Sequence, residues 1–167
     1  YGGVCDMNPI MSIAKKHNVA VLEDCAQCHM GKDDQGRLAG SIGDVGSWSF
    51  ENSKHLSSGD GGIILCHNKD LATKIRKLGG LGFKTLTADS GKVRTNRDKL
   101  QNPNWERFDV IGFNYRMSQL AAAVALAQVE RTEYHIDLRR AMGKDYTTVL
   151  SKSELLQPLI VPNGYFF

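Results

Sequence analysis

Lys54 is the residue of this sequence whose surroundings most favour chemistry. It ends the segment Ser49–Lys54 and is followed by the glycine-rich run Gly59-Asp60-Gly61-Gly62. A lysine amine that attacks an aldehyde must lose its proton, and hydroxyl groups with a glycine turn nearby can hold a cofactor phosphate. A single lysine in such a loop is usually a solvated charge. The prediction of Schiff-base chemistry therefore depends on the polar residues that accompany it.

Three further residues would complete a site for pyridoxal phosphate. Asp24 could pair with the pyridine nitrogen, Gln27 could contact the ring oxygen and Ser49 could bind the phosphate. Taken singly, an aspartate is more often a cap, a glutamine a surface residue and a serine an ordinary strand residue. The joint order Asp-x-x-Gln, then Ser-x4-Lys, then Gly-Asp-Gly-Gly is what favours a cofactor site.

The elements that position Asp24 are predicted from the hydrophobic pattern. Asn8-Pro9 predicts the N-cap and first residue of a helix to about His17, with Asn18 as its C-cap. An apolar strand, Val19 to Leu22, is then closed by Glu23-Asp24. Functional side chains of parallel α/β sheets gather at such C-terminal strand ends.

The remaining elements are placed in the same way. Strands over 45–50 and 62–66 would flank the Lys54 loop. Asn68 would cap a helix of about 70–78, which Gly79-Gly80 ends. Ser118 would cap the longest helix, which ends near Leu150 and has a surface-exposed second half. Residues 84–107 are polar and predict an exposed excursion rather than a domain.

The composition is that of a globular protein. Of the 167 residues, 41% are hydrophobic and 23% are charged, and the net charge of +3 is spread over both signs. No basic stripe with aromatic residues favours nucleic acid, no apolar run is long enough to span a membrane, and no metal site is predicted. One core is expected. Because the chain starts at Tyr1 and ends on aromatic residues, we expect a fragment of a longer protein.

The four cysteines allow two other interpretations. Cys25-Ala26-Gln27-Cys28-His29 matches the pattern for covalent c-type haem attachment, and Cys25 with Cys28 matches a redox dithiol. Haem domains of that type are small and helical, and a redox pair needs a helix N-terminus to lower its thiol pKa. Small buried thiols in a reducing compartment are the favoured interpretation.

The motifs together resemble the DegT/DnrJ/StrS-type family of nucleotide-sugar aminotransferases, which are fold type I enzymes that use pyridoxal phosphate. The resemblance implies an incomplete large domain of the aspartate-aminotransferase-like α/β fold, with a mixed, mostly parallel sheet flanked by helices. Residues 1–150 would belong to this cofactor-binding domain, and residues 151–167 would connect it to a C-terminal small domain. The matching stretches are 23–29, 40–44, 49–50, 53–54, 59–62, 112–117 and 122–128.

The resemblance also implies roles. Asp24 would pair with the pyridine nitrogen, Gln27 with the ring oxygen, Ser49 with the phosphate and Lys54 with the aldehyde. Asn114 would reach the cofactor phosphate of the neighbouring subunit in a homodimer with shared active sites. The enzyme would move an amino group from glutamate or glutamine to a nucleotide-linked keto sugar. It would work in the cytoplasm, in biosynthesis of cell-surface polysaccharide such as lipopolysaccharide, or of secondary metabolites.

The sequence departs from the family pattern at a few positions. Asp60 stands where the family usually has Glu, and Cys25 and Cys28 replace small residues. Met30 replaces a usual Gly, so the turn after His29 is expected to differ. One branch of the family replaces the lysine with histidine and dehydrates its substrate; because Lys54 is kept, aminotransfer is favoured. The alternative is a non-enzymatic family member that uses the bound cofactor as a regulator or sensor.

Overall fold

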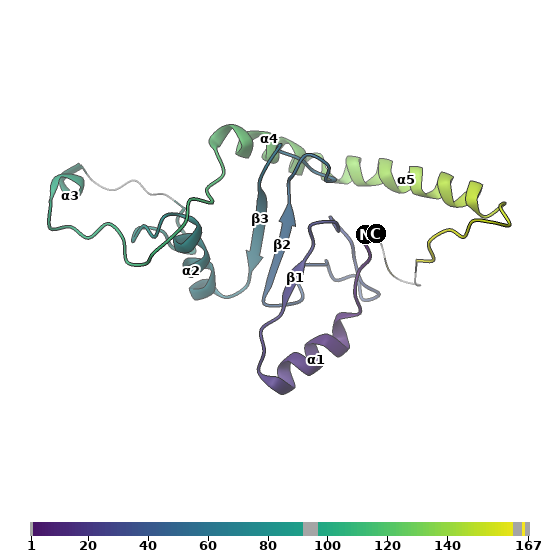
Figure 1. Ribbon diagram of the computed structural model, residues 1–167, viewed down its shortest axis with the longest axis horizontal. Coiled ribbons are helices and arrows are strands. Elements are labelled where there is room, and N and C mark those ends of the chain that lie inside the picture. Colours follow the sequence, from purple (N-terminus) through teal and green to yellow (C-terminus); the bar gives the residue numbers. More distant parts are fainter. Residues whose placement is uncertain (1, 92–96, 162–164, 166–167) are drawn as a thin grey trace. The chain divides into compact units, whose positions relative to one another are not determined.

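The computed structural model describes residues 2–91, 97–161 and 165. They form two compact units, one made of residues 1–65 with 119–167 and the other of residues 66–118. Within the described residues, no helix combines the length and apolarity needed to cross a membrane. The elements, in chain order, are α1 (Met7–His17), β1 (Leu22–Asp24), β2 (Val45–Ser49), β3 (Gly62–Cys66), α2 (Lys69–Gly79), α3 (Arg97–Gln101), α4 (Gln119–Glu130) and α5 (Thr132–Leu150) (Figure 1).

The sheet has the strand order β1-β2-β3. Strands β1 and β2 are parallel, with Glu23 opposite Gly46 and Asp24 opposite Ser47, whereas β3 runs antiparallel to β2 (Figure 1). The predicted α/β class with a mixed sheet is confirmed. Strand β1 is shorter than expected, since it begins at Leu22 rather than at Val19. The carbonyl of Val21, just before it, accepts hydrogen bonds from the N–H groups of Asp44 and Val45.

Helix α1 begins two residues earlier than predicted. Asp6 is the N-cap, and its Oδ1 accepts a hydrogen bond from the backbone N–H of Asn8 at 3.1 Å. The prediction of Asn8 as the N-cap was therefore wrong. Asp6 and Asn8 are both residue types that cap helices, and Asp6 is the one that does so here. The predicted C-cap is confirmed, because Asn18 is left-handed (φ 51°) and its N–H bonds to the carbonyls of Ala14 and Lys15.

A small core lies next to the C-terminal end of β1. Cys25, Cys28 and Ala39 are buried together, with Val4 and Trp48 packed against them. The cysteines are free, so the predicted packing role of these two thiols is confirmed. Burial is the main cause that raises the pKa of Cys25, to about 12, and it also raises the pKa of Cys28. Thiols with raised pKa values are poor nucleophiles, which argues against a redox pair.

The predicted long helix is two helices, α4 and α5, interrupted at Arg131. Next to the break, the Thr132 hydroxyl donates to the carbonyl of Val129 at 2.7 Å, and Thr132 is buried. A hydroxyl that bonds back to the preceding turn competes with regular helical hydrogen bonds. The second helix is mostly exposed, as expected, with Thr132 and Ile136 as its buried residues.

The second unit is organised around α2. The side chain of Asn68 caps this helix by accepting from the backbone N–H of Leu71 at 2.9 Å. The helix ends at Gly79 with Gly80 as its C-cap, so both predicted ends are confirmed. The chain returns to this end later: Phe113 donates to the carbonyl of Leu78, and Gly80 forms a β-bridge with Asn114. Helix α3 is a single short turn within the predicted polar excursion.

Candidate active site

The end of β1 carries two adjacent carboxylates with different surroundings. Neighbouring residues of a strand point to opposite faces. The Glu23 side chain is buried and accepts hydrogen bonds from the backbone N–H groups of Gly40, Ile42 and Gly43, at 2.7, 2.7 and 2.6 Å. The Asp24 side chain is exposed, and its Oδ1 accepts from the N–H of Ala26 at 3.0 Å. One carboxylate is therefore built into the protein and the other is open.

The loop between β2 and β3 holds Lys54. The N–H of Lys54 donates to the carbonyl of Glu51 at 3.1 Å, and Leu56 anchors the loop as a buried residue. The Glu51 carboxylate accepts from the N–H and the hydroxyl of Ser53 at 2.9 and 2.6 Å. The side-chain hydrogen bond from Ser53, first among several causes, lowers the pKa of Glu51. Glu51 thus stays ionised and fixes the turn from which the lysine extends.

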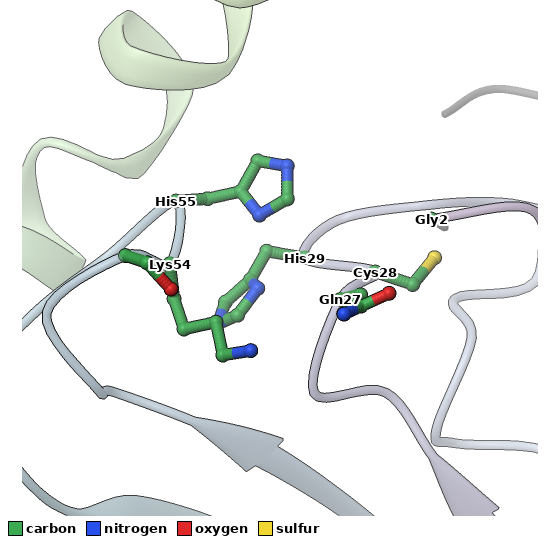
Figure 2. Close-up of a pocket in the computed structure, with 7 residues that line it drawn as sticks. Gly2, Gln27, Cys28, His29, Lys54 and His55 are labelled. Carbon is green, nitrogen blue, oxygen red and sulfur yellow. The ribbon is translucent and has the colours of Figure 1, made fainter.

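Lys54 lies in a cavity of about 400 Å³ that also includes Gln27. Figure 2 shows the Lys54 side chain extending from its loop into the space beside His29 and Gln27. Two of the predicted cofactor contacts are thereby brought together by segments that are distant in the sequence. The cavity is lined by Gly2, Gln27, Cys28, His29, Ser53, Lys54 and His55.

The other predicted site residues lie elsewhere. Asp24 lines a neighbouring cavity of about 320 Å³, which shares Cys28 with the first. Ser49 is the last residue of β2, and its Oγ accepts from the N–H of Glu51 at 3.2 Å. Asn114 belongs to the second unit, where its Oδ1 accepts from Nε of Arg116 at 3.0 Å. The cofactor roles of these residues stay predictions.

A buried histidine joins the two segments that carry Gln27 and Lys54. His29 is 5% exposed, and its Nε2 lies 3.0 Å from the carbonyl oxygen of Ser49. Burial, and then the charge of His55, lowers the pKa of His29 to about 4, against the hydrogen bond to Ser49, which acts in the other direction. The ring is therefore neutral near pH 7, with Nε2 as the donor and Nδ1 as the acceptor.

The two imidazoles are neighbours in this cavity. The ring centroids of His29 and His55 are 5.1 Å apart, and burial, followed by the charge of Arg139, lowers the pKa of His55 as well. Within the described residues, Nδ1 of each ring is buried without a hydrogen-bond partner. Two neutral imidazoles, each with such an unpaired nitrogen, thus form part of the cavity wall beside Lys54. Because Nε2 of His29 is held by Ser49, it is not free to ligate haem iron.

Two residues of this region were missed by the sequence reasoning. Glu23 was interpreted as the end of a strand and His29 as part of a haem pattern, and both fell in the matching stretch 23–29, but neither was given a role in the site. The signal for Glu23 was its place at the end of an apolar run, ahead of the closely spaced Gly40 and Gly43. No local signal indicated the partner of His29, because Ser49 is 20 residues away.

The turn after His29 is unusual, as the departure at Met30 suggested. Met30 has φ 62°, a left-handed conformation that glycine adopts without cost and other L-residues avoid. Met30 thus adopts the backbone conformation for which a glycine would be suited.

Comparisons with known proteins show which family the chain belongs to. A GDP-perosamine synthase of Caulobacter vibrioides is 36% identical over 91% of this chain and 36% of its own length. An L-glutamine:2-deoxy-scyllo-inosose aminotransferase of Streptoalloteichus tenebrarius is 30% identical over 93% of this chain and 35% of its own length. The chain thus spans about a third of these relatives.

A solved structure shares the fold of this chain. The aminotransferase TlmJ of Streptoalloteichus hindustanus superposes with a TM-score of 0.79 and 29% identity, over 99% of this chain and 41% of its own. The model of the DegT/DnrJ/EryC1/StrS aminotransferase family, whose enzymes depend on pyridoxal phosphate, matches residues 1–164. The fold and the resemblance drawn from the motifs are confirmed. The chain belongs to the DegT/DnrJ/EryC1/StrS aminotransferase family.

Proposed function

We propose that this chain is the cofactor-holding part of an aminotransferase, which moves an amino group from glutamate or glutamine to a nucleotide-linked keto sugar. The observation that carries the proposal is the shared cavity of Lys54 and Gln27, in a chain of this family, with Asp24 in a neighbouring cavity that shares Cys28. The names of the relatives support both substrates: one names a GDP-linked amino sugar and the other names L-glutamine.

The side chains of this region fit pyridoxal phosphate. Lys54 provides an amine within a cavity of about 400 Å³, and Gln27 an exposed amide in the same cavity. Asp24 provides a carboxylate that, among the described residues, accepts one backbone hydrogen bond. The Ser49 oxygen already accepts from Glu51, so its own hydrogen is left to donate to a phosphate oxygen. Each requirement of the cofactor thus has a donor or acceptor of the right kind.

The bound cofactor would supply an electron sink that stabilises negative charge at the carbon that loses its proton. Lys54 would hold the aldehyde covalently and, once displaced by the donor amine, would use Nζ to move the proton from the donor's α-carbon. Asp24 would keep the ring nitrogen protonated, because a nearby carboxylate favours the charged form. Gln27 would orient the ring through its oxygen.

The test uses the full-length protein, of which we infer this chain to be a part. After loading with pyridoxal phosphate, one turnover with glutamate or glutamine should convert the visible band of the lysine-linked cofactor to that of its aminated form. A protein that binds the cofactor but converts neither donor would instead be a regulator or sensor. A pyridine haemochrome spectrum would identify the haem alternative.

We extend the proposal to a homodimer in which Asn114 reaches the partner's cofactor phosphate. A doubly charged phosphate needs several positioned hydrogen-bond donors. The residues of this chain that are predicted to hold the cofactor supply few of them, so a second subunit would have to contribute. Asn114→Ala should weaken cofactor binding while leaving the dimer intact. In mixed dimers of Lys54→Ala with Asn114→Ala subunits, one of the two sites regains both residues, so activity should partly return. No recovery in verified mixed dimers would end this part of the proposal.

The four free cysteines support a reducing compartment, and we place the enzyme in the cytoplasm. There it would supply amino sugars for cell-surface polysaccharides, including lipopolysaccharide, or for secondary metabolites. Fractionation of cells that express the full-length protein tests the compartment. Recovery of the protein in an oxidising extracytoplasmic fraction would contradict it.

A further inference from the structure

We propose that Glu23 is a positioning residue, which fixes the register of β1 against β2 so that the Asp24 carboxylate faces the cofactor rather than the protein interior. The proposal rests on the proposed function, because it takes the cofactor role of Asp24 from there. Glu23 would act through Asp24, without touching the cofactor or the substrate.

The first support is the contact set of the Glu23 carboxylate. Oε1 accepts from the N–H groups of Ile42 and Gly43, and Oε2 accepts from the N–H of Gly40. The side chain is 8% exposed. Three backbone donors that converge on one buried carboxylate form an anion-binding nest, with charge-assisted bonds that are stronger than neutral ones. The carboxylate therefore holds the loop 40–43, which lies immediately before β2.

The second support is the shape of this loop. Gly40 has φ 89°, in the left-handed region, and a Cβ on Gly46 would collide with the carbonyl of Gly40. The loop therefore folds back tightly on the strand that follows it. Its N–H groups can meet Glu23 only because the two glycines allow this close approach. A second tether runs alongside, since the N–H of Val21 donates to Oδ2 of Asp44 at 2.7 Å.

The third support is the geometry of a very short strand. Only three residues of β1 pair with β2, and two of them are adjacent carboxylates. A slip of one residue would exchange their faces, so that Asp24 would enter the nest and Glu23 would face outward. The aspartate is one methylene shorter than the glutamate that now spans the distance to the loop. The nest therefore favours the register in which Asp24 is open.

The experiment compares four variants of the full-length, cofactor-loaded protein. Glu23→Gln keeps the shape of the side chain, but its amide NH₂ group faces at least one of the backbone N–H groups of the loop, so two donors meet. Glu23→Asp keeps the negative charge but is too short to reach the loop in the same way. Asp24→Asn is the reference for loss of the ring-nitrogen partner. Asp33→Asn is the matched control: Asp33 is 1% exposed, and its carboxylate accepts from the backbone of Gln35 and Arg37 and from the Arg37 side chain, but it lines neither the Lys54 cavity nor the Asp24 cavity.

Three quantities are measured: the melting temperature, the pH midpoint of the cofactor's visible band, and kcat with KM for the amino donor. Both Glu23→Gln and Asp33→Asn should melt at a lower temperature. Only Glu23→Gln should also shift the pH midpoint in the direction that Asp24→Asn does, and lower kcat by about tenfold to a hundredfold with little change in KM. Glu23→Asp should lie between Glu23→Gln and the wild type.

Three other outcomes would contradict the proposal or decide where it fails. If Glu23→Gln lowers the melting temperature but leaves the pH midpoint and kcat at their wild-type values, Glu23 is only structural and the proposal is wrong. If Glu23→Gln does not fold, Glu23→Asp decides between the same two outcomes. If Asp24→Asn itself leaves the band and kcat unchanged, the cofactor role of Asp24 fails, and the failure belongs to the proposed function.

Discussion

The two sides of the β1 end differ in how completely their polar groups are paired. What we call the anchored side is the pair Glu23 and His29, which are buried and bond to backbone groups of the loop before β2 and of Ser49. His29 also borders the Lys54 cavity and, in the part of the chain that the structure describes, keeps Nδ1 unpaired, but its Nε2 is fixed. On the open side, Asp24 has one backbone hydrogen bond, and Lys54 with Gln27 lines a cavity. Buried polar groups must be paired to be tolerated, whereas groups that bind a ligand must keep capacity for it.

This difference separates residues that position the site from residues that would touch the cofactor. Residue type alone does not tell a positioning residue from a cofactor-contacting one, because Glu23 and Asp24 are neighbours and both are acids. A substitution on the open side should reduce activity and leave stability nearly unchanged. A substitution on the anchored side should reduce stability first. The following predictions test this division, starting from the largest effect.

Lys54→Ala should lower transamination by ~10³-fold or more, because Lys54 carries the one side-chain amine among the described residues that line the cavity, and both the covalent bond and the proton transfer need it. The melting temperature should change little, because Lys54 is on the open side. Borohydride reduction of the loaded wild type, followed by peptide mapping, should place the cofactor on the peptide with Lys54. Lys32→Ala is the control and should be fully active. Label on Lys32 or Lys74 would refute the assignment.

Asp24→Asn should lower kcat by roughly a hundredfold, the usual effect of losing one positioned electrostatic partner. The side chain keeps its shape, and the amide oxygen can still accept from Ala26, so the protein should remain folded. Steady-state rates are compared with those of Asp34→Asn, which removes a charge from an exposed loop residue. A rate near that of the wild type in Asp24→Asn would mean that Asp24 has only a structural role.

The parts of the fold that were predicted correctly depend on neighbours in the sequence. Asn68 and Asn18 cap helices through contacts within three or four residues, so their chemistry is visible locally. The N-cap of α1 was misplaced because Asp6 and Asn8 both suit the role. The break at Arg131 was missed because no Gly or Pro marks it, and it coincides with a hydroxyl contact and the burial of Thr132.

The same reasoning explains what was found of the site. Lys54 and Gln27 lie in short motifs whose residue types carry the chemistry, and the structure brings them into one cavity. Glu23 and His29 were missed because their partners lie 17 to 20 residues away. The residues that touch a ligand are thus easier to predict than those that hold them, since the latter depend on the tertiary fold.

The anchored side should make stability depend on pH through His29. Its pKa is about 4 in the folded protein, mainly because of burial, against an ordinary value of 6.5. Between these values the unfolded chain binds more protons, so the free energy of unfolding should fall as pH drops from 6.5 toward 4, by at most about 3 kcal/mol. His55, whose pKa is lowered mainly by burial, contributes with the same sign.

The measurement is urea unfolding of the full-length protein at several pH values in this range. His29→Gln cannot titrate but retains an N–H that can donate to the carbonyl of Ser49. It should therefore lose less stability than the wild type as the pH falls from 6.5 toward 4, so its stability should depend less steeply on pH. His17→Gln, at the exposed end of α1, is the control and should keep the wild-type slope. An unchanged slope in His29→Gln would mean that His29 titrates normally.

The smallest effect concerns Met30, directly after His29. Its left-handed backbone (φ 62°) costs a non-glycine residue about 1–2 kcal/mol. Met30→Gly removes that strain together with the side chain, whereas Met30→Ala removes the side chain beyond Cβ and keeps the strain. The difference in stability between the two variants therefore measures the cost of the left-handed backbone. Glycine should be more stable than alanine here by roughly 1 kcal/mol in urea unfolding, the reverse of the order expected at ordinary positions. Neither variant should change kcat by much, because Met30 does not line the Lys54 cavity. If alanine is the more stable of the two, the turn is relaxed in solution and the anchored side is less rigid than the structure implies.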